Sequence, residues 1–87
     1  MEIIEMRLGK LKEFPGNPRT ISEHIMESLI NSIRHFGYVE PIVYNRRTGH
    51  VVGGNQRLKA LKKIHGQNKR VKVVAIDMPP EEERKLN

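Results

Sequence analysis

Apolar and polar residues alternate at the start of the chain, as they do in a strand with one buried face. Ile4, Met6 and Leu8 fall on one side of residues 2–8, and the residues between them fall on the other. The next stretch, residues 10–14, has no clear period. The sequence Pro15-Gly16-Asn17-Pro18 then has the composition of a loop, and we expect it to lead into a helix.

Three later apolar runs predict further strands. Residues 42–44 and 50–52 are separated by a turn-forming sequence that ends in Gly49, so we expect them to form a hairpin with Gly49 in the left-handed turn position. Residues 71–76 form another apolar run, which predicts an additional strand.

The first predicted helix begins after Arg19. The sequence from Thr20 to Glu23 fits a capping box, in which Thr20 is the N-cap and the Glu23 side chain bonds to the backbone N–H of Thr20. Gly37 is a natural C-cap. Apolar residues then recur at helical spacing. We expect all of them to face the core: Ile25, Met26, Leu29, Ile30, Ile33 and Phe36.

Two more helices are predicted in the second half of the chain. One follows Gly53-Gly54, has Asn55 as its cap, and ends at Gly66; its expected inner face is Leu58, Ala60, Leu61 and Ile64. The other starts near Pro80, where a run of glutamates complements the helix dipole. Because the chain stops soon afterwards, we expect residues 1–87 to be a single domain and the N-terminal part of a longer protein.

Composition narrows the classes of function. The chain has 87 residues and a formal net charge of +6, which favours a polyanionic partner such as nucleic acid or a nucleotide phosphate, although a solvated basic surface would have the same charge. It contains no cysteine, which excludes disulfides, thiolate metal sites and a cysteine nucleophile. No apolar run is long enough for a transmembrane helix, and we expect a cytoplasmic protein.

The glycine pair at the start of the second helix has the chemistry of an anion site. A helix N-terminus exposes N–H groups and a partial positive charge, and glycines let a ligand approach the backbone. Gln56 adds an amide and Arg57 a guanidinium that can bind phosphate oxygens through two parallel hydrogen bonds. The alternative from the residues alone is a tight turn followed by an ordinary cap.

The order of motifs resembles the N-terminal domain of the ParB family, also called the ParB-like nuclease domain, and is similar to sulfiredoxin, which shares its fold. The resemblance covers nearly the whole chain: Pro18-Arg19, the capped helix, Pro41-Ile42-Val43, and above all the Gly-x-x-Arg box of residues 54–57. The Gly-Gly-x-Gln-Arg-Leu-Lys-Ala variant looks most like domains attached to phage and prokaryotic DNA methyltransferases and to plasmid or phage regulators.

This resemblance implies an α+β fold of the ParB/sulfiredoxin type, with a small mixed β-sheet and two to three helices. In ParB proteins the box binds the triphosphate of CTP, and in sulfiredoxin and a related serine kinase it holds phosphates of ATP or ADP. We therefore expect CTP or ATP here, with Mg²⁺ carried by the nucleotide. The expected phosphate contacts are Gly53, Gly54, Asn55, Gln56, Arg57, Arg19 and Asn17.

The chain departs from its relatives in ways that bear on catalysis. Partition ParB proteins commonly have Glu-Arg where this chain has Asn55-Gln56, so the carboxylate associated with metal and hydrolysis is absent. Sulfiredoxin activity is excluded, because its catalytic cysteine has no counterpart. Glu40 is the one acid in a loop that could face the box, and is the candidate catalytic base. The four histidines lack metal-ligand spacing, so no metal site is assigned.

The preferred function is a nucleotide-phosphate-binding, DNA-associated module linked to DNA partition, regulation or modification. The alternatives are a ParB-like nuclease or small-molecule phosphotransferase, and a basic DNA-binding or protein-interaction domain with a vestigial phosphate loop. We expect DNA to be a partner through the full-length protein, and homodimerisation is left open. The candidate contacts to the DNA backbone are Arg46, Arg47, Lys59, Lys62 and Lys63.

Overall fold

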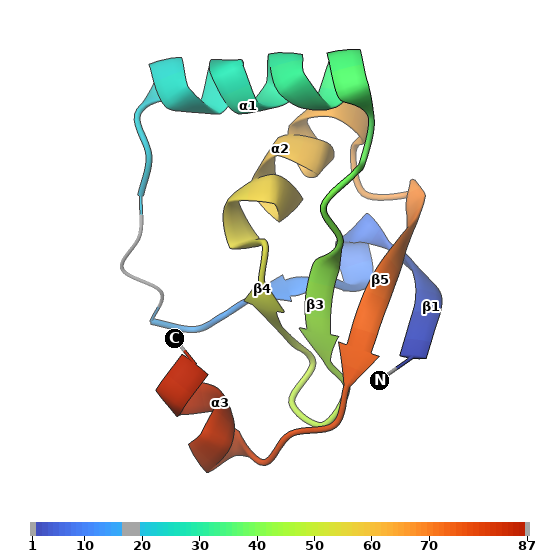
Figure 1. Ribbon diagram of the computed structural model, residues 1–87, viewed down its shortest axis with the longest axis vertical. Helices are drawn as coiled ribbons and strands as arrows, with labels where there is room; N and C mark the ends of the chain where they lie inside the picture. Colours follow the sequence, from blue (N-terminus) through green and yellow to red (C-terminus); the bar gives the residue numbers. More distant parts are fainter. Residues whose placement is uncertain (1, 17–19, 87) are drawn as a thin grey trace.

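The computed structural model describes residues 2–16 and 20–86, and shows a mixed sheet with α1 and α2 stacked on one side of it and α3 at the opposite end (Figure 1). Within these residues the sheet has five strands in the order β1-β5-β3-β4-β2. The β1–β5 and β3–β4 pairs are antiparallel, whereas β5–β3 and β4–β2 are parallel. The strands are β1 (Glu2–Arg7), β2 (Lys12–Glu13), β3 (Ile42–Asn45), β4 (His50–Gly53) and β5 (Arg70–Ile76).

Three of the described helical elements lie in connections between strands, and the last one, α3, follows β5. The described helical elements are the short 3₁₀ helix η1 (Leu8–Lys10), α1 (Glu23–Phe36), α2 (Asn55–His65) and α3 (Pro80–Leu86). The predicted α+β class with a small mixed sheet is confirmed. The stretch without a clear period contains β2, a strand too short for periodicity to reveal.

The alternation predicted for the first strand is confirmed by its pairing with β5. Ile4 lies opposite Val73 and Met6 opposite Val71, all on the inner face, and the intervening residues of β1 are exposed. The strand ends at Arg7, because Leu8 opens η1 and is fully buried there. The predicted hairpin is also present, with Gly49 at φ 82°.

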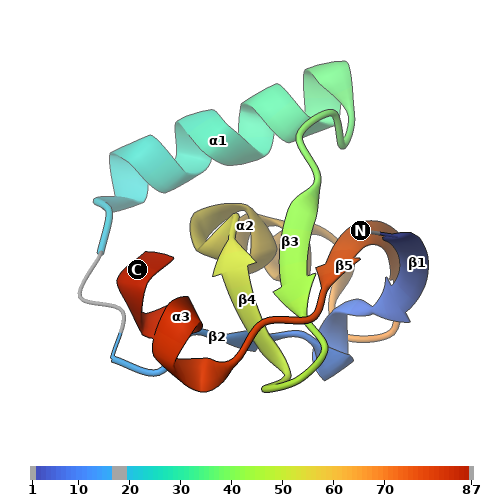
Figure 2. The same cartoon turned by 60° about the horizontal axis from the view of Figure 1, so that its bottom comes forward.

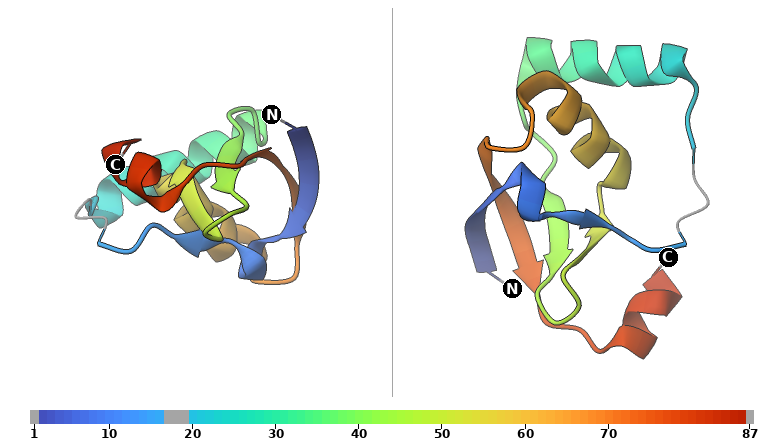
Figure 3. Two further views of the ribbon diagram at one scale, coloured as in Figure 1. Left: turned by 90° about the horizontal axis from the view of Figure 1, so that it is seen from below. Right: turned by 180° about the vertical axis from the view of Figure 1, so that it is seen from behind.

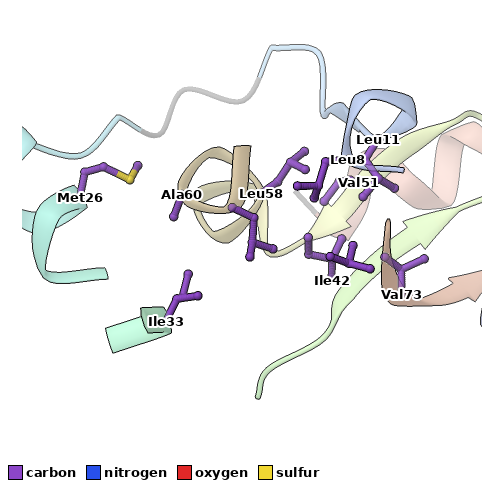
Figure 4. Close-up of a cluster of buried hydrophobic side chains, with 11 residues drawn as sticks. Leu8, Leu11, Met26, Ile33, Ile42, Val51, Leu58, Ala60 and Val73 are labelled. Atoms are coloured by element: carbon purple, nitrogen blue, oxygen red, sulfur yellow. The ribbon is translucent and has the colours of Figure 1, made fainter. Parts of the chain in front are cut away.

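Helix α2 is the middle layer of the molecule and lies between the sheet and α1 (Figure 3). Figure 4 shows its side chains between Met26 and Ile33 of α1 on one side and Ile42 and Val73 of the sheet on the other. Of the four residues predicted for its inner face, Ile64 is partly buried, and the other three are buried: Leu58, Ala60 and Leu61. The helix ends at Gly66, as predicted.

Helix α1 differs from the prediction at its start. It begins at Glu23, and Ser22 rather than Thr20 is the N-cap, because the Ser22 hydroxyl accepts a hydrogen bond from the Ile25 N–H at 3.2 Å. Gly37 ends the helix as predicted, with its N–H donating to the Ile33 carbonyl.

The predicted core face of α1 was too wide. Met26 and Ile33 are buried and Leu29 and Ile30 partly buried. By contrast, Ile25 and Phe36 are 55% and 68% exposed. The reason is that α1 packs mainly against α2, and a single neighbouring helix covers a narrower stripe than a sheet would.

Helix α3 is attached to the turn end of the β3–β4 hairpin (Figure 2). Glu83 is 2% exposed; its carboxylate accepts a hydrogen bond from the Thr48 hydroxyl and is hydrogen-bonded to His50 Nδ1, each at 3.0 Å. Buried Asn45 binds the segment before α3, since its amide donates to the Met78 carbonyl and its oxygen accepts from the Met78 N–H. In the described part of the chain, no helix is long and apolar enough to cross a bilayer.

The corrected N-cap can be tested by substitution. We expect Ser22→Ala to lower the free energy of unfolding by about 1 kcal/mol, because the Ile25 N–H loses its acceptor. Thr20→Ala is the matched control and should leave stability unchanged. The measurement is urea unfolding of both variants followed by circular dichroism, and a larger loss for Thr20→Ala would restore the capping box that the sequence suggested.

Candidate functional site

The junction between β4 and α2 is built around Gly54. Its backbone is left-handed, with φ 87° and ψ 27°, and it is the N-cap of α2. A β-carbon at this position would lie 3.3 Å from Ile42 Cγ1 and 3.4 Å from Ile42 Cα, so the left-handed backbone favours glycine and a side chain would also be tight against Ile42. Gly53 is less constrained, because a β-carbon there would make only ordinary contacts with Val43 at 3.4 Å.

A glycine N-cap gives the start of α2 no side-chain acceptor from the N-cap residue itself. The first intrahelical hydrogen bond runs from the Leu58 N–H to the Gly54 carbonyl at 2.8 Å. The backbone N–H groups before Leu58 lie in the first turn, where the helix itself supplies no acceptors. Gly54 provides no side-chain cap, so the N-cap residue itself does not neutralise the positive end of the helix dipole.

Arg57 stands on that first turn and is held by the loop before β3. Its Nη2 lies 3.1 Å from Glu40 Oε2, and its side chain is 17% exposed, whereas that of Glu40 is 78% exposed. The guanidinium is thus positioned by the protein, but its carboxylate partner is solvent-accessible. An ion pair of this kind contributes about 0–1 kcal/mol, so a stronger anion can displace Glu40.

Tyr38 completes the surroundings of Arg57. Its hydroxyl accepts a hydrogen bond from the Ile42 N–H at 2.7 Å. Burial raises the pKa of the Tyr38 hydroxyl, and the Ile42 hydrogen bond and the positive charge of Arg57 oppose this with smaller effects. The phenol therefore stays neutral at neutral pH and leaves the charge of Arg57 uncompensated on this side.

Asn55 does not cap the helix as expected. It is the first residue of α2 and is 9% exposed; its amide donates to the Val51 carbonyl at 3.1 Å, and its oxygen accepts from the Phe14 N–H at 3.2 Å. The side chain therefore ties the segment after β2 to the Gly54 junction. This role was missed because Phe14 is distant in sequence.

Gln56 lines a groove of about 440 Å³ between α2 and the N-terminal half of α1. Lys59 and Lys63 contribute from α2, and Glu23 and Glu27 contribute from α1. The groove opens beside the junction, so the site has polar groups of both charges next to the helix end. Asn17 and Arg19, the remaining predicted phosphate contacts, lie outside the described residues.

The chain was compared with models of known protein families. The family model described as the ParB N-terminal domain matches residues 1–86. The chain belongs to the ParB N-terminal domain family. No match was found among curated proteins.

Solved structures agree with this assignment. The C-terminally truncated chromosome-partitioning protein ParB from Caulobacter crescentus, complexed with CTP-γ-S, has a TM-score of 0.80 and 24% identity and is matched over 99% of this chain. This chain spans 50% of that protein's chain. Sulfiredoxin from Arabidopsis thaliana has a TM-score of 0.76 at 22% identity, covering 99% of this chain and 97% of its own. These two likenesses confirm the ParB/sulfiredoxin fold.

A second Caulobacter crescentus ParB structure, complexed to the centromeric parS site, has 27% identity and a TM-score of 0.68 over 90% of this chain and 42% of its own. The likeness to each of these three structures thus extends over nearly the whole of this chain. The Gly54 junction lies within the residues that the family model matches.

The predicted DNA-backbone residues of this ParB-type domain are mostly engaged within the chain. Arg46 pairs with Glu2, Arg47 Nε lies 2.7 Å from Asp77, and Lys59 Nζ lies 3.3 Å from Glu13. The other two are on α2, where Lys62 donates to the Leu11 carbonyl at 3.1 Å and Lys63 is exposed. Contact of these residues with DNA stays a prediction.

Among the described residues, one cluster of a hydroxyl, an imidazole and a carboxylate resembles a catalytic triad in composition but not in its contacts. Thr48, His50 and Glu83 lie together, but the hydroxyl and the imidazole both bind the carboxylate, so the nucleophile-to-base contact of a triad is not formed. Glu40, the candidate base, lies against Arg57. Among residues 2–16 and 20–86, no group of three or more His, Asp or Glu side chains could hold a metal ion.

The requirement for glycine at the N-cap of α2 is open to direct test. We expect Gly54→Ala to lower the free energy of unfolding by about 1–2 kcal/mol, because an L-residue is strained in the left-handed conformation. Gly53→Ala is the matched control beside it and should have a much smaller effect. Equal losses in the two variants, measured by denaturant unfolding, would contradict the special role of Gly54.

Proposed function

We propose that this chain is a nucleotide-phosphate-binding, DNA-associated module of the ParB type, and that it is the N-terminal part of a longer protein. The observation that carries the proposal is the combination at one helix end: an N-terminus whose N-cap, Gly54, brings no side chain, and the guanidinium of Arg57, positioned by an exposed partner. Backbone N–H groups would bind phosphate oxygens, and Arg57 would neutralise charge.

CTP is the preferred nucleotide, and ATP is the alternative. The Caulobacter crescentus relative is complexed with CTP-γ-S, which supports a pyrimidine triphosphate. The junction itself contacts phosphates, so its chemistry does not distinguish the bases. In the described part of the chain no carboxylate cluster could hold Mg²⁺ by itself, so the ion would arrive with the phosphates. Gly53, Gly54, Gln56 and Arg57 are the proposed contacts, and Asn55 positions them.

The association with DNA is proposed from the family and from the net charge of +6. A related ParB is complexed to the centromeric parS site, which supports a role beside DNA partition, regulation or modification. No helix-turn-helix is recognisable in this sequence, so this chain alone is proposed to contact DNA without reading its bases.

Replacement of Arg57 tests the phosphate site. We expect calorimetric titration of the chain with CTP in magnesium-containing buffer to give saturable binding, and Arg57→Ala to weaken it by about 10–100-fold, as expected for loss of charge-assisted hydrogen bonds. ATP and ADP titrated in parallel would identify the base preference. The control is Arg34→Ala, which removes an exposed arginine from the last turn of α1. Wild-type affinity in Arg57→Ala would contradict the proposal.

Glu40→Gln separates binding from catalysis. If Glu40 only competes with phosphate for Arg57, the amide should bind CTP as tightly as the wild type or up to about fivefold more tightly, because an exposed pair is worth about 0–1 kcal/mol. If Glu40 is a general base, nucleotide hydrolysis or DNA cleavage by the wild type should disappear in this variant. Titration and turnover assays on the same preparations distinguish these results.

A further inference from the structure

The exposed face of the β1–β5 pair carries a cluster of cations outside the phosphate site. The cluster, which we call the basic face, consists of Arg7, Lys10, Lys69, Arg70 and Lys72, all exposed. In the described part of the chain none of these side chains makes an ion pair or side-chain hydrogen bond. This contrasts with Arg46, Arg47 and Lys59, each of which pairs with an acid.

The strand register brings these charges together. Arg7 and Arg70 are direct partners in the antiparallel ladder, and Lys72 lies opposite Glu5. In β5 the exposed positions alternate with buried Val71 and Val73, so Arg70 and Lys72 share the face that points away from α2. Alternate residues on one face of a strand are about 6.8 Å apart, so the charges form a row rather than a single point.

The row is extended where η1 meets the turn between α2 and β5. The Leu8 N–H donates to the Lys69 carbonyl, and the Gly9 N–H donates to the Gln67 carbonyl, both at 2.9 Å. These backbone bonds place Lys10 and Lys69 at the same end of the β1–β5 pair as Arg7 and Arg70. Figure 3 shows β1 and η1 lying along this side of the molecule, away from α3.

The charges of Arg7 and Arg70, which lie opposite each other, do not stabilise the fold. Like charges directly opposite each other on a sheet face destabilise it, whereas opposite charges stabilise it. The described β1–β5 ladder contains two acids, Glu2 and Glu5. Glu2 pairs with Arg46, so Glu5 is the one acid of the ladder that lies beside the row of cations. A polyanion bound across the two strands would be attracted to both arginines and would offset the repulsion between them.

We infer that the basic face binds the phosphate backbone of duplex DNA without sequence preference. The described aromatic residues lie elsewhere: Phe14 packs on His50, Phe36 lies beside His35 on α1, and Tyr38 and Tyr44 border the core. A face without aromatic side chains offers no stacking for unpaired bases, which favours a duplex over a single strand. The inference rests on the DNA-associated part of the proposed function and is independent of the nucleotide site.

The test measures binding of a fluorescently labelled, mixed-sequence DNA duplex by anisotropy across a range of salt concentrations. We expect Arg7→Gln combined with Arg70→Gln to weaken binding by about tenfold or more at low salt, and to reduce the slope of log K against log salt by about one for each contact removed. The matched control removes the same charge from α3, by Arg84→Gln combined with Lys85→Gln, and should bind as the wild type does.

Two further measurements distinguish a lost DNA contact from a damaged fold. The Arg7/Arg70 variant should unfold at the same or a higher temperature than the wild type, because it loses a like-charge pair, and it should keep wild-type CTP binding. Equal DNA affinity and salt slope in this variant and the wild type would overturn the inference and leave DNA association to other residues. Absence of duplex binding by the wild type, or binding of anionic lipid vesicles in place of DNA, would also overturn it.

Discussion

The left-handed backbone of Gly54, packed against Ile42, is the constraint on which the rest of the molecule depends. It turns the chain from β4 into α2 within one residue, at a place where a side chain would meet a fully buried core residue. The direction of α2 follows from this turn. Leu58 and Leu61 then enter the core, and Ala60 is small enough for α1 to pack close on the other side.

The same turn creates the candidate site, because it starts α2 at a residue without a side chain and places Arg57 beside the loop that precedes β3. The fold and the candidate site therefore share one local geometry. The surrounding polar contacts maintain it: Asn55 ties Phe14 and Val51 to the junction, and Tyr38 holds the Ile42 N–H. Buried polar groups of this kind specify an arrangement because leaving any of them unpaired is costly.

The charges of the chain divide into two classes that composition cannot separate. Those near the hairpin tip and along α2 are largely matched with acids or carbonyl oxygens, as with Arg47 and Asp77 or Lys62 and Leu11. Those on the basic face are unmatched and, at Arg7 and Arg70, mutually repulsive. Unpaired cations thus gather beside the outer side of β1 and β5, on the face of β5 that points away from α2.

The amino-acid sequence by itself determined the alternation of β1, the hairpin with Gly49, and the ends of α1 and α2 at glycines. These features depend on local periodicity and on glycine conformations, which neighbouring residues reveal. The α+β class and the Gly-x-x-Arg box were recognised from the order of motifs, through the resemblance to the ParB family. Only the tertiary structure decided that Ser22 caps α1, that Ile25 and Phe36 stay exposed, and that Asn55 bonds to Phe14 rather than capping its helix. It also decided which cations find partners. Each of these outcomes depends on which distant element packs alongside, and such contacts between residues far apart in the chain leave no periodic signal in the sequence.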